Sequence, residues 1–209
     1  DMSQLFENKY SFNSDISNWD VSNVTTMWKM FARCGSFNQD IGSWDVSSVE
    51  NMGWMFMNNN SFDQDISRWV VDNVTRMDFM FHGASSFNQD ISTWNVSSVD
   101  NMARMFENAS TFNQNISSWN FSASTVIAMF KGASSFNQPI GNWDLSNVKS
   151  TSYMFSMAIN FDQDIGNWNM SNIISTREMF WGARSFNQDI SGWDVSSIYN
   201  SEGMFQGAN

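Results

Sequence analysis

The chain has 209 residues, of which 42% are hydrophobic, and its 21 acidic and 10 basic residues give a net charge of −11. This acidity excludes electrostatic binding of nucleic acid or of an anionic membrane, because both require a basic surface. The single cysteine, Cys34, excludes an internal disulfide framework.

No apolar run approaches the roughly 18–20 residues that a membrane-spanning helix requires. The chain therefore predicts no transmembrane segment, and no targeting segment is visible in it. Because the sequence begins inside a repeat, we expect it to be a fragment of a longer protein.

In chain order, the first element is a half-repeat over residues 1–11, which is followed by eight repeats over residues 12–209. The repeat reads F-N-Q-D-I-S-x-W-D-V-S-x-V-x-x-M-x-x-M-F-x-x-A-x-S. Its first phenylalanine recurs every 25 residues, except for one step of 24 between Phe112 and Phe136. A fixed period of this length is typical of a solenoid.

Besides the first phenylalanine, three apolar positions of the repeat hold the same residue in every copy, namely the isoleucine, the tryptophan and the second phenylalanine. One repeat is too small to bury these side chains alone, whereas stacked coils bury them between neighbours. We therefore predict a single solenoid domain over residues 1–209, with an N-terminal half-coil and eight full coils.

Within each coil the sequence predicts one short strand and one short helix. Residues 91–96 have the spacing of a leucine-rich-repeat strand. Val99, Met102, Met105 and Phe106 then form an apolar stripe of the kind that covers one face of a helix. The predicted fold class is an α/β repeat solenoid that is leucine-rich-repeat-like.

The repeat resembles that of the BspA-like surface proteins, which are leucine-rich-repeat relatives with Met, Phe, Ile and Trp in place of much of the leucine. Residues 87–92, residues 94–97 and the Met102, Met105 and Phe106 spacing carry the resemblance. It covers essentially the whole chain and implies an extracellular or cell-surface protein with a role in adhesion or host contact. It implies no catalytic residues.

An aspartate recurs at the fourth position of most repeats, which stacks carboxylates roughly 5 Å apart. One interpretation is that each carboxylate caps a turn by accepting its N–H groups. The alternative is calcium bound between the coils, since stacked carboxylates suit a hard cation. The residues concerned include Asp15, Asp40, Asp65 and Asp90.

A second polar column flanks the predicted strand and should point away from the core. In a leucine-rich-repeat architecture this side is the concave face, where ligands bind. The sequence therefore predicts a possible ligand-binding face, with a solvated polar surface as the alternative. Its residues are Asp20, Asp45, Asn95, Asn120, Asp144, Asn169 and Asp194.

Large apolar side chains also occur at helix positions that should face outward and that hold small or charged residues in other repeats. A contiguous patch of exposed aromatic rings usually marks a protein interface. The alternative is that these rings lie against neighbouring coils. The predicted partner-binding residues are Trp28, Trp54, Met57, Phe79, Tyr153 and Trp181.

The sequence predicts that the chain is not an enzyme. His82 is the single histidine and Cys34 the single cysteine, so nucleophilic and His/Cys metal sites lack their usual residues. We expect no cofactor, and we expect a protein partner or a surface ligand. The leading hypothesis is a non-catalytic recognition or adhesion solenoid, and the alternative is a structural subunit that packs laterally in a larger assembly through its exposed aromatics.

Overall fold

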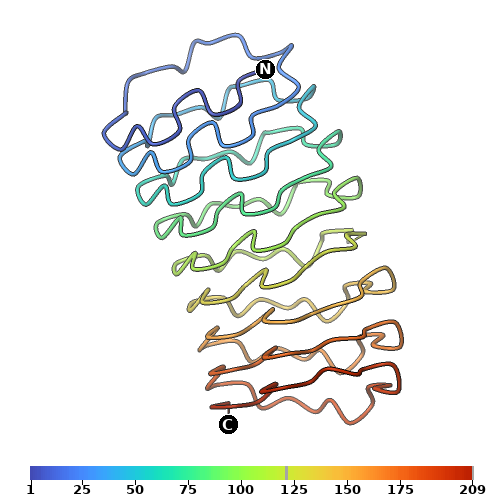
Figure 1. Cartoon of the computed structure of the whole chain (residues 1–209). Helices are drawn as coiled ribbons and strands as arrows, with labels where there is room; N and C mark the ends of the chain where they lie inside the picture. The colour runs from blue at the N-terminus through green and yellow to red at the C-terminus, as the bar shows by residue number, and fades with distance from the viewer. Residues whose placement is uncertain (121, 209) are drawn as a thin grey trace.

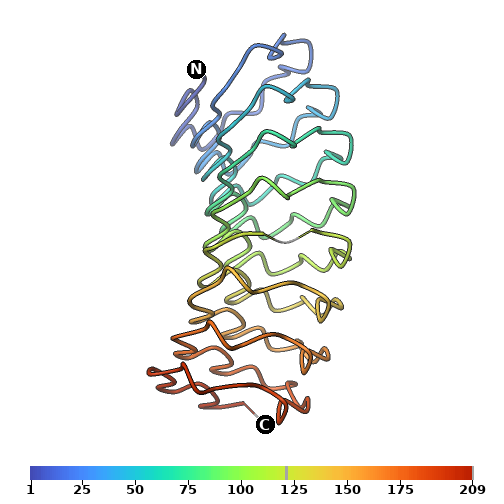
Figure 2. The same ribbon diagram turned by 90° about the vertical axis from the view of Figure 1, so that its right-hand side faces the viewer.

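The computed structural model describes residues 1–120 and 122–208, which form an elongated stack of flattened coils with the termini at opposite ends (Figures 1 and 2). These residues contain no helix, and hence none that is long and apolar enough to span a bilayer. Their β-structure is confined to isolated parallel bridges between neighbouring coils. The bridges are Thr26 to Asn51, Asn51 to Arg76, Arg76 to Asn101, Asn101 to Thr125, Ser150 to Ser175 and Ser175 to Asn200.

The predicted α/β fold, with one helix and one strand in each coil, is therefore wrong, although the repeat itself is present as a coil. The helix fails because its backbone groups bond differently from those of an α-helix, where each N–H reaches the carbonyl four residues earlier. The Met30 N–H instead closes a tight turn on the Met27 carbonyl at 3.0 Å. The Lys29 N–H donates to the Gly53 carbonyl of the next coil, also at 3.0 Å. Alternate amides thus close turns and join coils.

Backbone dihedral angles exclude a helix at the same place. Each outward turn has a left-handed residue at its third position, such as Lys29 with φ 57° and Arg33 with φ 60°. A left-handed residue cannot continue a right-handed helix, and for a residue other than glycine it costs roughly 1–2 kcal/mol. Glycine occupies such a position at Gly83, whereas the bulky Trp54 holds an equivalent one with φ 63°.

The predicted strand is replaced by two further turns. In the second coil, the Trp44 N–H donates to the Ile41 carbonyl at 3.1 Å, and the Val49 N–H donates to the Val46 carbonyl at 2.9 Å. Side chains make most of the links to the neighbouring coil on this side. The Trp44 Nε1–H, for example, donates to the Ile16 carbonyl at 3.3 Å.

A column of asparagine and aspartate side chains adds a second set of links between coils. The Asn38 backbone N–H donates to Asn13 Oδ1 at 2.9 Å, and Asn38 Oδ1 in turn accepts the Asp63 N–H at 2.9 Å. Each amide or carboxylate therefore bonds the backbone of the following coil. Side-chain acceptors here take the place that strand carbonyls would have in a sheet.

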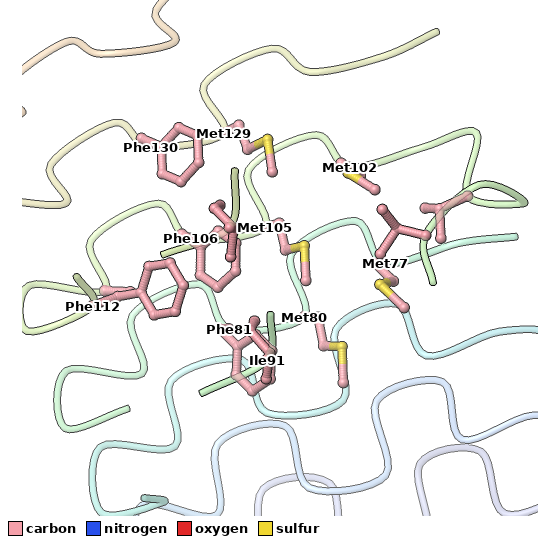
Figure 3. Packing of buried hydrophobic residues seen from close by; sticks show 14 of the residues in the cluster. Met77, Met80, Phe81, Ile91, Met102, Met105, Phe106, Phe112, Met129 and Phe130 are labelled. Carbon is pink, nitrogen blue, oxygen red and sulfur yellow. The ribbon is translucent and has the colours of Figure 1, made fainter. Parts of the chain in front are cut away.

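The core lies between the two sides of the coil and consists of stacked columns of identical side chains. Figure 3 shows Phe81, Phe106 and Phe130 on successive coils, with Met80 and Met105 beside them. The Phe81 and Phe106 ring centroids are 5.8 Å apart and the Phe106 and Phe130 centroids 5.6 Å apart, with the rings nearly parallel. All five side chains are fully buried. Each coil thus covers the apolar face of its neighbour, as the solenoid prediction requires.

Asn59 is an exception within this core. It is fully buried in a column that holds Cys34 and Ala84 in the neighbouring coils, and neither Oδ1 nor Nδ2 has a hydrogen-bond partner. An unpaired buried amide costs roughly 1–3 kcal/mol. We therefore expect Asn59→Ala to raise the free energy of unfolding by about 1–3 kcal/mol in urea titrations. The exposed neighbour Asn60 is the control, and a loss of stability in Asn59→Ala would contradict the prediction.

Candidate functional site

Each coil has two outward sides that differ in charge. We call the segments with the left-handed turns the turn face and the remaining segments the acidic side. The turn face consists of residues 1–11, 26–36, 51–61, 76–86, 101–111, 125–135, 150–160, 175–185 and 200–208. The acidic side holds 15 acidic and 2 basic residues, for a net charge of −13, whereas the turn face holds 8 basic and 6 acidic residues, for a net charge of +2.

On the acidic side, both aspartate columns cap turns. Asp15 Oδ1 accepts the Ser17 backbone N–H at 2.9 Å, and Asp20 Oδ1 accepts the Ser22 N–H at 3.0 Å and its hydroxyl at 2.7 Å. These hydrogen bonds stabilise the charged carboxylate and lower the pKa of both aspartates. The geometry is that of the capping interpretation. Asp40, Asp65 and Asp90 make the same contact with the residue two positions later.

The residues predicted as a possible ligand face lie in one exposed column of the acidic side. Most of their side-chain Oδ1 atoms cap turns, whether the residue is aspartate or asparagine, as in Asp45 with Ser47 at 3.1 Å and Asn95 with Ser97 at 3.2 Å. Val70 holds this position in the third coil and is 52% exposed. The column therefore presents a repeated polar surface. Within residues 1–120 and 122–208, no group of three or more His, Cys, Asp or Glu residues could hold a metal ion.

All six predicted partner-binding residues lie on the turn face, and two of them stack on each other. The Trp54 and Phe79 ring centroids are 4.0 Å apart, with 23° between the ring planes. Lys29 Nζ lies 5.0 Å from the Trp54 ring, and the Arg104 guanidinium lies 5.5 Å from the Phe79 ring. The four side chains form a ladder over four successive coils, in which cations cover the outer ring faces.

The remaining predicted residues are distributed along the same face. Trp28 is half-buried, with Lys29 Nζ 4.4 Å from its ring, and Met57 is buried. Tyr153 is half-buried between the cations Lys131 and Arg177, which lie 5.5 and 5.9 Å from its ring. Trp181 is 37% exposed. The aromatic rings thus share a face, and most of them also contact a neighbouring side chain.

Two carboxylates are buried beneath the basic side chains of the turn face. Asp78, at 6% side-chain exposure, accepts hydrogen bonds from Arg76 Nε at 3.0 Å and from Trp54 Nε1 at 3.0 Å. Glu107, at 5% side-chain exposure, lies 2.9 Å from Arg104 Nη1, 3.4 Å from Lys131 Nζ and 3.2 Å from His82 Nδ1. The two carboxylates are therefore buried, whereas the side chains of Arg76, Arg104 and Lys131 remain partly exposed to solvent.

The environment of Glu107 fixes its charge. Burial raises the pKa of this carboxyl, but the neighbouring His82 and the positive charges of Arg104 and Lys131 outweigh that effect. Together they hold the pKa at about 2, below the ordinary value of 4.5. Glu107 is therefore ionised at neutral pH and anchors three basic side chains from adjacent coils.

Sequence reasoning missed the basic residues and the two buried carboxylates as members of this surface. Eight of the ten basic residues fall in the turn segments, and this partition is visible once the repeats are aligned. No pattern in the sequence predicted that Asp78 and Glu107 would be buried beneath them, because most coils hold a residue other than an acid at these two positions.

Three overlapping stretches of the chain, residues 1–84, 44–128 and 122–209, match the family described as "Mycoplasma protein of unknown function, DUF285". The chain belongs to this family. Membership of DUF285 agrees with the repeat architecture and leaves the finer resemblance to BspA-like proteins as a hypothesis. A comparison with curated proteins finds no match.

Proposed function

We propose that this DUF285 protein is a non-catalytic binding scaffold at the cell surface, and that the turn face is its binding surface. The proposal rests on one observation above all. The turn-capping columns of the acidic side hold mostly aspartate or asparagine, whereas most outward positions of the turn face differ from coil to coil. A surface that recognises one partner needs residues that do not repeat, since a repeated surface offers the same contacts at every coil.

The third residue of the first outward turn illustrates this contrast. Its occupants in successive coils are Gln4, Lys29, Trp54, Phe79, Arg104, Ala128, Tyr153, Glu178 and Gly203. Every one of them has a left-handed backbone, which favours glycine. Bulky aromatics at this position carry a backbone cost without filling the core, so their presence favours a role in contacts. Aromatic and arginine side chains are also the residues that interfaces use as anchors.

The chemistry of the remaining reactive groups supports a non-catalytic role. Burial raises the pKa of the Cys34 thiol to about 11, so this side chain stays protonated at neutral pH. Its Sγ donates to the Phe6 carbonyl at 2.8 Å. His82 lies against Glu107, and the exposed aspartates cap turns. A recognition or adhesion role follows from these features together with the resemblance to surface proteins.

Hydroxyl-radical footprinting of the purified chain and of intact producing cells tests the proposal. On cells, oxidation of the turn-face residues Met157 and Trp181 should fall at least threefold, and oxidation of Tyr199 shows whether the acidic side is covered as well. The three residues are 38%, 37% and 78% exposed, so each gives a readable signal in the purified chain. Unchanged oxidation of Met157 and Trp181 on cells would refute the turn face as the binding surface.

The same cells test the location. A membrane-impermeant amine reagent should label the exposed Lys149 without lysis. Labelling that requires lysis would exclude the cell surface and leave the binding role to be judged by the footprint alone.

A further inference from the structure

We propose that the turn face binds the acidic side of a second copy of this chain, so that rods pack side by side. We call this arrangement face-to-back, with the acidic side as the back. This inference rests on the proposed function, because it names the partner of the same surface. The partner is identified by charge complementarity: a side with net charge −13 and a face with net charge +2 occur on one rod.

The charges that reach the solvent differ more than these sums indicate. On the turn face, Arg76 retains 50% of its side-chain exposure while its partner Asp78 retains 6%. Arg104 and Lys131 retain 40% and 37%, while Glu107 beneath them retains 5%. A partner approaching this face therefore meets basic groups and aromatic edges. On the acidic side, in contrast, Asp15, Asp20, Asp40 and Asp45 are exposed.

The two sides also share a period. On the acidic side, carboxylates occur at one place in six of the eight repeats and at a second place in four, and Arg76, Arg104 and Lys131 lie on three successive coils of the turn face. Two parallel rods with the same coil spacing stay in register along their whole length. Basic side chains on successive coils of one rod can then each meet a carboxylate of the other rod, which adds weak pairs into a stable interface.

Electrostatics disfavours other pairings. Two acidic sides repel each other, since each carries 15 acidic and 2 basic residues. Contact between a turn face and an acidic side attracts, and the pair retains one free turn face, on one rod, and one free acidic side, on the other. Such a heterologous contact does not close, so it builds open lateral assemblies rather than a two-fold dimer.

The chain itself suggests how to neutralise the acidic side without unfolding it. Asn95 and Asn169 occupy the column of Asp20 and Asp45 and still cap their turns, at 3.2 and 3.1 Å. A variant carrying Asp20→Asn, Asp45→Asn, Asp144→Asn and Asp194→Asn therefore keeps the caps and loses four charges. We call it the back variant.

A matched variant alters the turn face. It carries Arg33→Glu, Arg104→Gln, Arg177→Gln and Arg184→Glu, and we call it the face variant. Arg104 is replaced because Glu107 still retains Lys131 and His82 as partners. Arg33 and Arg184 are both exposed. Unfolding midpoints within a few degrees of wild type show that either variant is folded.

Sedimentation velocity at about 20 mM and 500 mM salt, with tens of micromolar protein, measures the association, because salt screens pairs of exposed charges. Wild-type protein should form dimers and larger species at low salt and monomers at high salt. Each variant alone should need at least tenfold more protein to associate. Mixing the two variants should restore association but stop at one-to-one dimers, because a single intact face meets a single intact back.

Two results would overturn the inference: a wild-type chain that stays monomeric at low salt, or a back variant that associates as wild type does. The first result combined with protection of Met157 and Trp181 on cells would leave the proposed function standing with a different partner. Association in solution without protection on cells would instead contradict the proposed function.

Discussion

Replacing Trp94 with alanine should lower the free energy of unfolding by about 3–5 kcal/mol, the range for large aromatic residues removed from cores. Trp94 is 3% exposed, and its ring centroid lies 6.3 Å from that of Trp69, with the ring planes nearly parallel. Its Nε1–H donates to the Ile66 carbonyl of the preceding coil at 3.2 Å. Alanine would leave a cavity in the middle of the stack and an unpaired carbonyl.

Urea unfolding followed by tryptophan fluorescence and circular dichroism measures this change. Trp181→Ala serves as the control, since this tryptophan is 37% exposed on the turn face and should contribute less than about 1 kcal/mol. A Trp94→Ala variant that unfolds at the same urea concentration as Trp181→Ala would show that the tryptophan column does not hold the coils together.

The repeat, the stacked columns and the side on which each column lies were all predictable from the sequence. They follow from one requirement, the burial of identical apolar side chains at a fixed period, which the alignment states directly. The spacing of the apolar residues could not distinguish a helix from the outward turns. Met77, Met80, Phe81 and Ala84 are buried, as on a helix face, because outward turns alternate two inward residues with two outward ones. Over eight residues, a period of four is indistinguishable from the 3.6 of a helix.

The strand prediction failed for a related reason. The prediction that Trp94 and Val96 both point toward the core was correct, since both are buried. A strand also requires backbone partners on both sides, and this requirement leaves no mark on a single sequence. Serine, aspartate and asparagine near Trp94 favour turns, because their side chains form hydrogen bonds with the nearby backbone. In this chain the backbone therefore forms turns in place of the strand.

Part of the candidate site could likewise be predicted. The outward aromatic residues could be predicted because the repeats can be compared with one another. Trp54 and Phe79 are large aromatic residues at a position that holds small or charged residues in other repeats. Burial of Asp78 and Glu107 depends on which residues the adjacent coils place over them. That information lies in Arg76, two residues before Asp78, in Arg104, three residues before Glu107, and in His82, one repeat before Glu107.

The Glu107 cluster should make the stability of the rod depend on pH. The folded pKa of this carboxyl, about 2, lies below its ordinary value of 4.5. A group of this kind adds stability that is fully present above pH 4.5 and is lost as the pH falls toward 2. The difference between the two pKa values corresponds to about 3 kcal/mol at neutral pH.

Glu107→Gln should therefore lower the free energy of unfolding by about 2–3 kcal/mol at pH 7, since it leaves Arg104, Lys131 and His82 without their shared anion. Urea titrations at pH 7, 5, 4, 3 and 2 should show the gap between wild type and variant narrowing below pH 4.5. The comparison cancels the capping aspartates, whose carboxylates are protonated in both proteins over the same range. Glu202→Gln, at a side chain that is 70% exposed, should show no such gap. A gap between wild type and Glu107→Gln that stays constant from pH 7 to pH 2 would mean that the charge of Glu107 does not stabilise the fold.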